Sequence, residues 1–133
     1  MAESGTGIAY LDGVRMRRSL LAAADWVEAC REELNRINVF PVPDGDTGTN
    51  FAATLRAVAE SVRTLEQPTL PTVTQAMANA CVFSAQGNSG MLLSHFLLGF
   101  HKALGDTEVA SAVEVARALK SGAEQLSSSL DEP

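Results

Sequence analysis

The chain has few aromatic, cysteine and basic residues, and each shortage excludes a class of protein. Aromatic residues make up 5% of 133 residues that are 46% hydrophobic, so a core of aromatic and β-branched strands is not expected. Ten basic residues face sixteen acidic ones, and the net charge of −6 gives no electrostatic footprint for nucleic acid. No stretch approaches about eighteen uncharged apolar residues, so no membrane span is predicted.

The two cysteines, Cys30 and Cys81, lie in alanine-rich stretches without a CxxC motif or a histidine at metal-ligand spacing. We interpret both as small core residues. The first ten residues, MAESGTGIAY, lack the basic flank and apolar run of an export signal. A reducing, cytoplasmic location is therefore predicted.

The remaining sequence has the hydrophobic period of helices, and the predicted fold class is all-α. Residues 1–9 are small and polar and are expected to form a flexible tail, after which Asp12 can cap a helix from residue 13 to about residue 37. Further helices are predicted over about 51–65, 71–86, 91–104 and 108–130. About five helices in one domain, residues 10–133, indicate an antiparallel helical bundle.

Hydrophobic spacing also predicts which side chains face the core. Trp26 is expected to pack where the first helix meets a neighbour, and the segment 91–104 is apolar almost all round. In the last helix the predicted inward stripe consists of Val109, Val113, Ala116, Leu119, Ala123, Leu126 and Leu130.

Residues 43–50, Pro-Asp-Gly-Asp-Thr-Gly-Thr-Asn, interrupt the helical pattern with polar chemistry. Asp44 and Asp46 are two residues apart, so a turn at Gly45 would let their carboxylates converge on one or two Mg²⁺ ions. The hydroxyl and amide groups that follow lie at an expected helix N-terminus, where backbone N–H groups and the helix dipole favour phosphate. These groups belong to Thr47, Thr49 and Asn50.

A capped turn between helices explains the same octapeptide equally well, because aspartate, glycine, threonine and asparagine are common turn residues. A calcium-binding EF-hand loop is excluded. Gly48 would be its third ligand, and Leu55 stands where that loop requires a glutamate.

A second interruption, Gln-Gly-Asn-Ser-Gly at residues 86–90, directly precedes the apolar helix. Its backbone N–H groups and hydroxyl could contact phosphate oxygens, although alone it is better explained as a turn between helices. It is not a Walker loop, because neither Lys102 nor Lys120 follows it, and the order GNSG is not the GxSxG of a nucleophile elbow. The candidate phosphate-binding residues here are Gly87, Asn88, Ser89 and Gly90.

Together the two segments carry a family resemblance. INVFPVPDGDTGTNFAATLRAV, followed by AQGNSGMLLSHFLLGF, resembles the N-terminal kinase domain of fatty acid kinase A, within the dihydroxyacetone kinase L-type (DhaL) family. YLDG at residues 10–13 resembles the opening of that domain, so the similarity covers nearly the whole chain.

The resemblance implies a helical barrel that binds ATP with a pair of magnesium ions at one end. Asp44 and Asp46 would be metal ligands, with Asn38 in the place of a third aspartate found in the dihydroxyacetone branch. The acceptor would be the carboxylate of a fatty acid, presented by a separate fatty-acid-binding protein of the DegV or FakB type. Residues close to metal or phosphate would be Thr47, Thr49, Asn50, Gly87, Asn88, Ser89 and Gly90.

The predicted function is therefore the ATP- and Mg²⁺-binding domain of a fatty-acid-kinase-like phosphotransferase. Domains of this family continue past the fifth helix, so residues 10–133 are expected to be an incomplete DhaL-type barrel, truncated at its C-terminal side and active when completed. The alternatives are a non-catalytic nucleotide-binding or assembly module, and a subunit of a dihydroxyacetone-type kinase. A homodimer is compatible with each of them.

Overall fold

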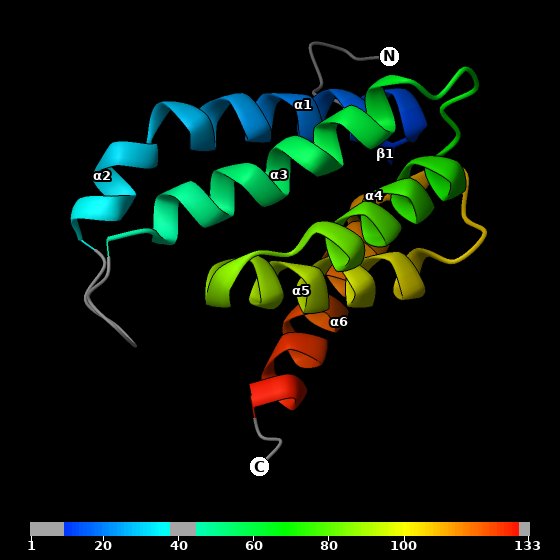
Figure 1. Cartoon of the computed structure of the whole chain (residues 1–133). Helices are drawn as coiled ribbons and strands as arrows, with labels where there is room; N and C mark the ends of the chain where they lie inside the picture. The colour runs from blue at the N-terminus through cyan, green and yellow to red at the C-terminus, as the bar shows by residue number, and fades with distance from the viewer. Residues whose placement is uncertain (1–9, 38–44, 131–133) are drawn as a thin grey trace, which may run out of the picture.

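The computed structural model describes residues 10–37 and 45–130. Within these ranges six helices pack together, and a pair of two-residue strands is added (Figure 1). The helices are α1 (Gly13–Ala29), α2 (Arg31–Arg36), α3 (Thr47–Arg63), α4 (Leu70–Ser84), α5 (Gly87–Leu104) and α6 (Ala112–Leu130), and the strands are β1 (Tyr10–Leu11) and β2 (Ala110–Ser111). The helical fold class is confirmed. The expected tail, residues 1–9, lies outside the described residues.

The long first helix of the prediction is divided in two at Cys30. This residue has φ −97° and ψ 4°, and its N–H donates to the carbonyls of both Trp26 and Val27 at 3.1 Å. α2 then packs against the first turn of α3 so closely that a Cβ at Gly48 would lie 2.2 Å from the carbonyl oxygen of Arg31. Neither proline nor glycine marks the division, so tertiary packing determines it.

The strands correct a second expectation, because no strand was predicted. Tyr10 pairs with Ser111 and Leu11 with Ala110 in antiparallel register, which ties the start of α1 to the start of α6. Asp12 follows β1 and caps α1 as predicted, since its Oδ1 accepts a 2.9 Å hydrogen bond from the Arg15 N–H.

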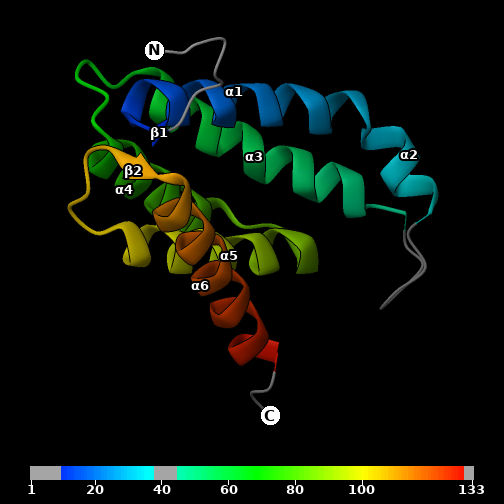
Figure 2. The ribbon, with the colours of Figure 1, turned by 180° about the vertical axis from the view of Figure 1, so that it is seen from behind.

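The helices form two groups joined by α3. Figures 1 and 2 show α1 and α3 side by side along one side of the molecule, with α4, α5 and α6 on the other. The core lies between them, and burial raises the pKa of the Cys81 thiol to about 11, as expected for a core cysteine. Cys30 is half-buried at the junction of α1 and α2. The largest fully buried side chains are Val58, Val62, Leu70, Val73 and Met77.

Two burial predictions were wrong. Trp26 is 71% exposed, and α6 does not bury its predicted stripe, because Val113 and Leu119 are 59% and 47% exposed. Instead α6 meets α5 through its small residues Ala118 and Gly122. A Cβ at Gly122 would lie 2.6 Å from the carbonyl oxygen of Phe96, so this close approach requires glycine.

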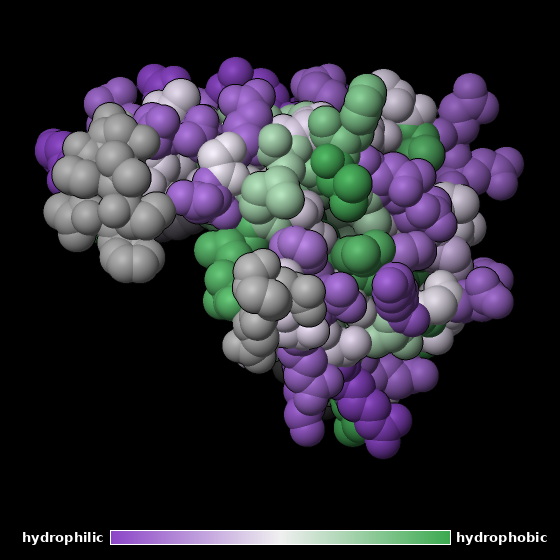
Figure 3. All heavy atoms as spheres, turned by 60° about the horizontal axis from the view of Figure 1, so that its bottom comes forward, coloured by the Kyte–Doolittle hydropathy of each residue, from purple (hydrophilic) through white to green (hydrophobic). Residues whose placement is uncertain are grey.

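Hydrophobic side chains reach the surface on the side of the molecule that carries α4, α5 and α6 (Figure 3). Nevertheless, no helix in the described part of the chain is both long enough and apolar enough to cross a membrane, as the sequence predicted.

Candidate functional site

The fold brings the two sequence segments into contact. α3 begins at Thr47 and α5 begins at Gly87, and both first turns lie at the same end of the molecule, with the start of α3 next to α2 (Figures 1 and 2). The Ser89 hydroxyl donates to the carbonyl oxygen of Thr47 at 3.3 Å, which joins the two turns directly. Residues 42 positions apart in the sequence therefore share one surface.

Small residues make this approach possible. Gly87 has a φ of +67°, and a Cβ there would lie 2.4 Å from Nδ2 of Asn50. At Gly90 a Cβ would lie 2.7 Å from Oγ1 of Thr54. Both glycines thus allow the start of α5 to contact α3, which is a packing role compatible with a ligand-binding one.

Thr54 is a fully buried connector that the sequence did not reveal. Its hydroxyl donates to the Asn50 carbonyl at 2.9 Å and accepts from the Gln86 N–H at 3.2 Å. The residue before α5 is therefore fixed to α3. A lone threonine within a hydrophobic helix gives no sequence signal for such a role.

The turn between α4 and α5 is shorter than predicted. α4 ends at Ser84, so the connection is Ala85 and Gln86, and the GNSG segment forms the first turn of α5. A first helical turn presents backbone N–H groups outward, which is the geometry that binds phosphate. Asn88 is exposed on this turn and Ser89 is half-buried.

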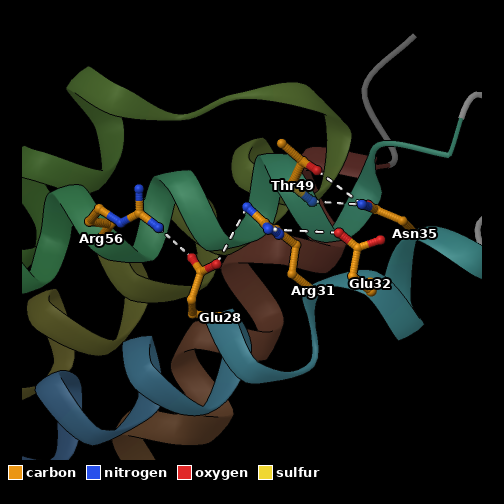
Figure 4. Close-up of polar contacts among 6 residues, drawn as sticks. All are labelled: Glu28, Arg31, Glu32, Asn35, Thr49 and Arg56. Atoms are coloured by element: carbon orange, nitrogen blue, oxygen red, sulfur yellow. Dashed lines mark hydrogen bonds and ion pairs between the residues drawn. The ribbon is translucent and has the colours of Figure 1, made fainter.

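The N-terminus of α3 is capped from another helix. Asp46 occupies the capping position, but its side chain makes no capping hydrogen bond. Instead Oδ1 of Asn35, on α2, accepts from the Thr49 N–H at 3.0 Å, and Nδ2 of Asn35 donates to Oγ1 of Thr49 at 3.0 Å (Figure 4). Sequence reasoning missed Asn35, because its partner is 14 residues away.

Ion pairs around Glu28 connect the same three helices. Glu28, at the end of α1, pairs with Arg31 of α2 at 3.4 Å and with Arg56 of α3 (Figure 4). Arg31 also approaches Glu32 at 3.7 Å. Both arginines are thus engaged by carboxylates. Pairs with this exposure contribute about 0.2–1 kcal/mol each, so they orient α2 more than they stabilise the fold.

The donor chemistry of this end of the molecule fits magnesium with phosphate. Asp46 supplies a carboxylate, and Thr47 and Thr49 supply hydroxyls, all hard oxygen donors. Within residues 10–37 and 45–130 no three acidic, histidine or cysteine side chains gather into a metal cage. Magnesium fits such a site, because it commonly takes one or two carboxylates together with phosphate oxygens. Asn38 and Asp44 lie outside the described residues.

Exposed hydrophobic side chains border the start of α5. Phe83, in the last turn of α4, is 92% exposed, and its neighbour Val82 and Met91 on α5 are also exposed. The polar first turn of α5 and an exposed apolar surface are therefore close together in the sequence and at the same helix junction.

The chain is similar to known proteins over most of its length. Residues 41–130 match the model of the DAK2 domain, a range that includes both helix starts. The chain is 35% identical over 115 residues to Protein YloV of Bacillus subtilis (strain 168), covering 86% of this chain and 21% of that protein. Identity is 30% over 115 residues to an uncharacterized protein of Staphylococcus saprophyticus, and 26% over 117 residues to one of Staphylococcus aureus (strain USA300).

The chain spans about a fifth of the length of these relatives, 21% in each case. DAK2 domains are the ATP-binding domains of DhaL-type kinases, and the family binds ATP and magnesium. Because the matched range covers most of the sequence, the chain belongs to the DAK2 domain family.

Proposed function

We propose that this chain is the nucleotide-binding domain of a fatty-acid-kinase-type phosphotransferase, and that the first turns of α3 and α5 together hold the phosphates of ATP. The observation that carries the proposal is the hydrogen bond from Ser89 to the Thr47 carbonyl, because it joins the two segments that the family resemblance assigns to metal and phosphate. A capped turn alone would not need the start of α5 beside it.

The proposed chemistry depends on positioning and charge neutralisation, which are the main requirements of phosphoryl transfer. N–H groups and dipoles at two helix starts would stabilise phosphate oxygens, with Ser89 and Asn88 as side-chain donors. Asp46 would hold magnesium, together with Asp44 and Asn38 as the resemblance implies. When bound, the metal would neutralise phosphate charge, since Arg31 and Arg56 are already paired with Glu28.

The proposed acceptor is a fatty acid carboxylate, presented by a fatty-acid-binding partner of the DegV type. Its oxygen would attack the γ-phosphorus, the bond to the β–γ bridging oxygen would break, and ADP and an acyl phosphate would result. The exposed Val82, Phe83 and Met91 support this acceptor class, because they place apolar surface at the α4–α5 junction. A non-catalytic assembly module and a dihydroxyacetone-type kinase subunit remain the alternative functions.

Titration calorimetry with ATP and Mg²⁺ tests the nucleotide site. We expect binding by the wild-type chain and a loss of about tenfold or more in affinity for Asp46→Asn, since a carboxylate ligand is removed. Asparagine is as good a helix cap as aspartate, so the melting temperature without ligand should change little.

The matched control is Asp25→Asn, which removes the same charge from an exposed position on α1 and should leave affinity unchanged. Absence of binding at millimolar nucleotide, or an Asp46→Asn variant that binds like the wild type, would contradict the proposal. A large fall in melting temperature for Asp46→Asn without ligand would instead assign the carboxylate a structural role in this turn.

A further inference from the structure

The hydrogen bonds between Asn35 and Thr49 have a fixed direction. The Thr49 backbone N–H can only donate, so it must face Oδ1 of Asn35, at 3.0 Å. This places the Nδ2 group of Asn35, which also can only donate, 3.0 Å from the Thr49 hydroxyl oxygen (Figure 4). The hydroxyl oxygen therefore accepts, and its proton points away from Asn35.

That proton has no acceptor among the residues the structure describes, and the Thr49 side chain is exposed at the start of α3. The Thr49 backbone N–H, by contrast, is already occupied by Asn35. Of the two donors that Thr49 could offer an incoming ligand, the hydroxyl is the one that Asn35 leaves available. Its direction is set by the amide of Asn35.

Asn35 is held rigidly enough to set this direction. It lies on α2, whose Arg31 carbonyl would be 2.2 Å from a Cβ at Gly48, and whose Leu34 Cβ would be 2.9 Å from the same atom. α2 therefore rests directly on the first turn of α3. The ion pairs of Arg31 with Glu28 and Glu32 further restrict its position.

We propose that Asn35 is a positioning residue, which turns the Thr49 hydroxyl outward as a hydrogen-bond donor to a phosphate oxygen of the bound nucleotide. This inference rests on the proposed function, and it changes the expected role of Thr49. Thr49 donates its hydroxyl proton to the ligand, while its backbone N–H donates to Asn35 across the α2–α3 contact. Asn35 does not itself touch the nucleotide.

Asn35→Asp separates positioning from capping. An aspartate can accept hydrogen bonds from both the N–H and the hydroxyl of Thr49, so the helix remains capped and the melting temperature should be equal or higher. The Thr49 proton would then turn inward. We expect the affinity for Mg²⁺–ATP, measured by titration calorimetry, to fall about tenfold, as for loss of a hydrogen bond to a charged group.

A double-mutant cycle distinguishes this effect from simple charge repulsion. Thr49→Val should lose a similar factor of affinity, Thr49→Ser should restore binding relative to Thr49→Val, and Asn35→Asp should cost little more once Thr49 is valine. Asn79→Asp, at an exposed position on α4, adds the same charge elsewhere and should bind like the wild type.

The outcomes are separable. If the wild type does not bind Mg²⁺–ATP, the proposed function fails and this inference fails with it. If the wild type binds but Asn35→Asp binds equally well, or the losses in the cycle multiply independently, only the positioning role is overturned. If Asn35→Asp does not fold, the Thr49 variants still test the positioning role. Equal affinities of Thr49→Val and Thr49→Ser for Mg²⁺–ATP would overturn that role.

Discussion

Residue-scale contacts determine how closely the helices of the candidate site approach one another. Gly48, Gly87 and Gly90 each occupy a place where a Cβ would lie less than 3 Å from a neighbouring atom, at 2.2, 2.4 and 2.7 Å respectively. The neighbours are the Arg31 carbonyl and the side chains of Asn50 and Thr54. These glycines allow α2 and the start of α5 to pack closely against α3. Their small size is therefore needed for helix packing whether or not a ligand is bound.

His101 gives the chain a predicted sensitivity to pH. It is half-buried on α5, its Nδ1 lies 2.8 Å from Oγ1 of the fully buried Thr74, and burial lowers the pKa of His101 from its ordinary value of 6.5. Below that value the unfolded chain binds more protons than the folded one. Protonation of His101 therefore leaves the free energy of unfolding unchanged above about pH 6.5. It lowers this free energy as the pH falls from there toward the pKa of His101 in the folded chain.

We expect His101→Gln to weaken the fall in melting temperature between about pH 7 and about pH 5, measured by circular dichroism. His95→Gln serves as the control, because it changes a histidine elsewhere on the same helix. An unchanged pH dependence in His101→Gln would show that the contact with Thr74 does not couple folding to protonation.

Local residue chemistry was predictable where the partner is near in sequence. Asp12 caps α1 through a residue three positions away, and a general rule of helix ends describes it. Asn35 could not be found in that way, since the approach of α2 to α3 decides its hydrogen bonds. For Trp26 the sequence predicted a packing contact that the fold does not make. Its size favoured burial, yet no helix among residues 10–37 and 45–130 covers its position on α1, and it remains exposed.

At the scale of elements, the helices were largely predictable and their faces were not. The spacing of hydrophobic residues located α3, α4, α5 and α6 closely, because each has a clear apolar period. For α6 the period identified the wrong face. Close contact through Ala118 and Gly122 buries backbone and small side chains against α5, while Val113 and Leu119 stay exposed. The spacing of hydrophobic residues does not reveal a helix–helix contact that is made by alanine and glycine.

Two adjacent substitutions on α6 test this orientation. Ala118 is fully buried, so Ala118→Leu should overpack the α5–α6 contact and cost about 1–3 kcal/mol in the free energy of unfolding. Leu119 is 47% exposed, so Leu119→Gln should change that free energy by no more than about 0.5 kcal/mol. Urea denaturation of both variants gives the comparison, and a Leu119→Gln loss larger than that of Ala118→Leu would contradict the described face.

For the whole molecule, the main result is that two distant sequence segments meet at one end of a helical fold. The order and content of the segments could be predicted, and so could the fold class, because both follow from motif and period. Their mutual contact depends on how α3 and α5 pack and needed the structure. The chain covers about a fifth of its relatives, 21% for Protein YloV, so catalysis and acceptor binding remain proposals for the whole protein.

The most direct measurement of the central claim is paramagnetic broadening by Mn²⁺, which replaces Mg²⁺ at sites built from carboxylates and phosphates. In a nitrogen-15 NMR spectrum of the chain with ATP, added Mn²⁺ should broaden the amide resonances of 47–50 and of 87–90 together, with weaker effects when ATP is omitted. Broadening of one segment alone, or of neither, would contradict a single nucleotide site formed by the starts of α3 and α5.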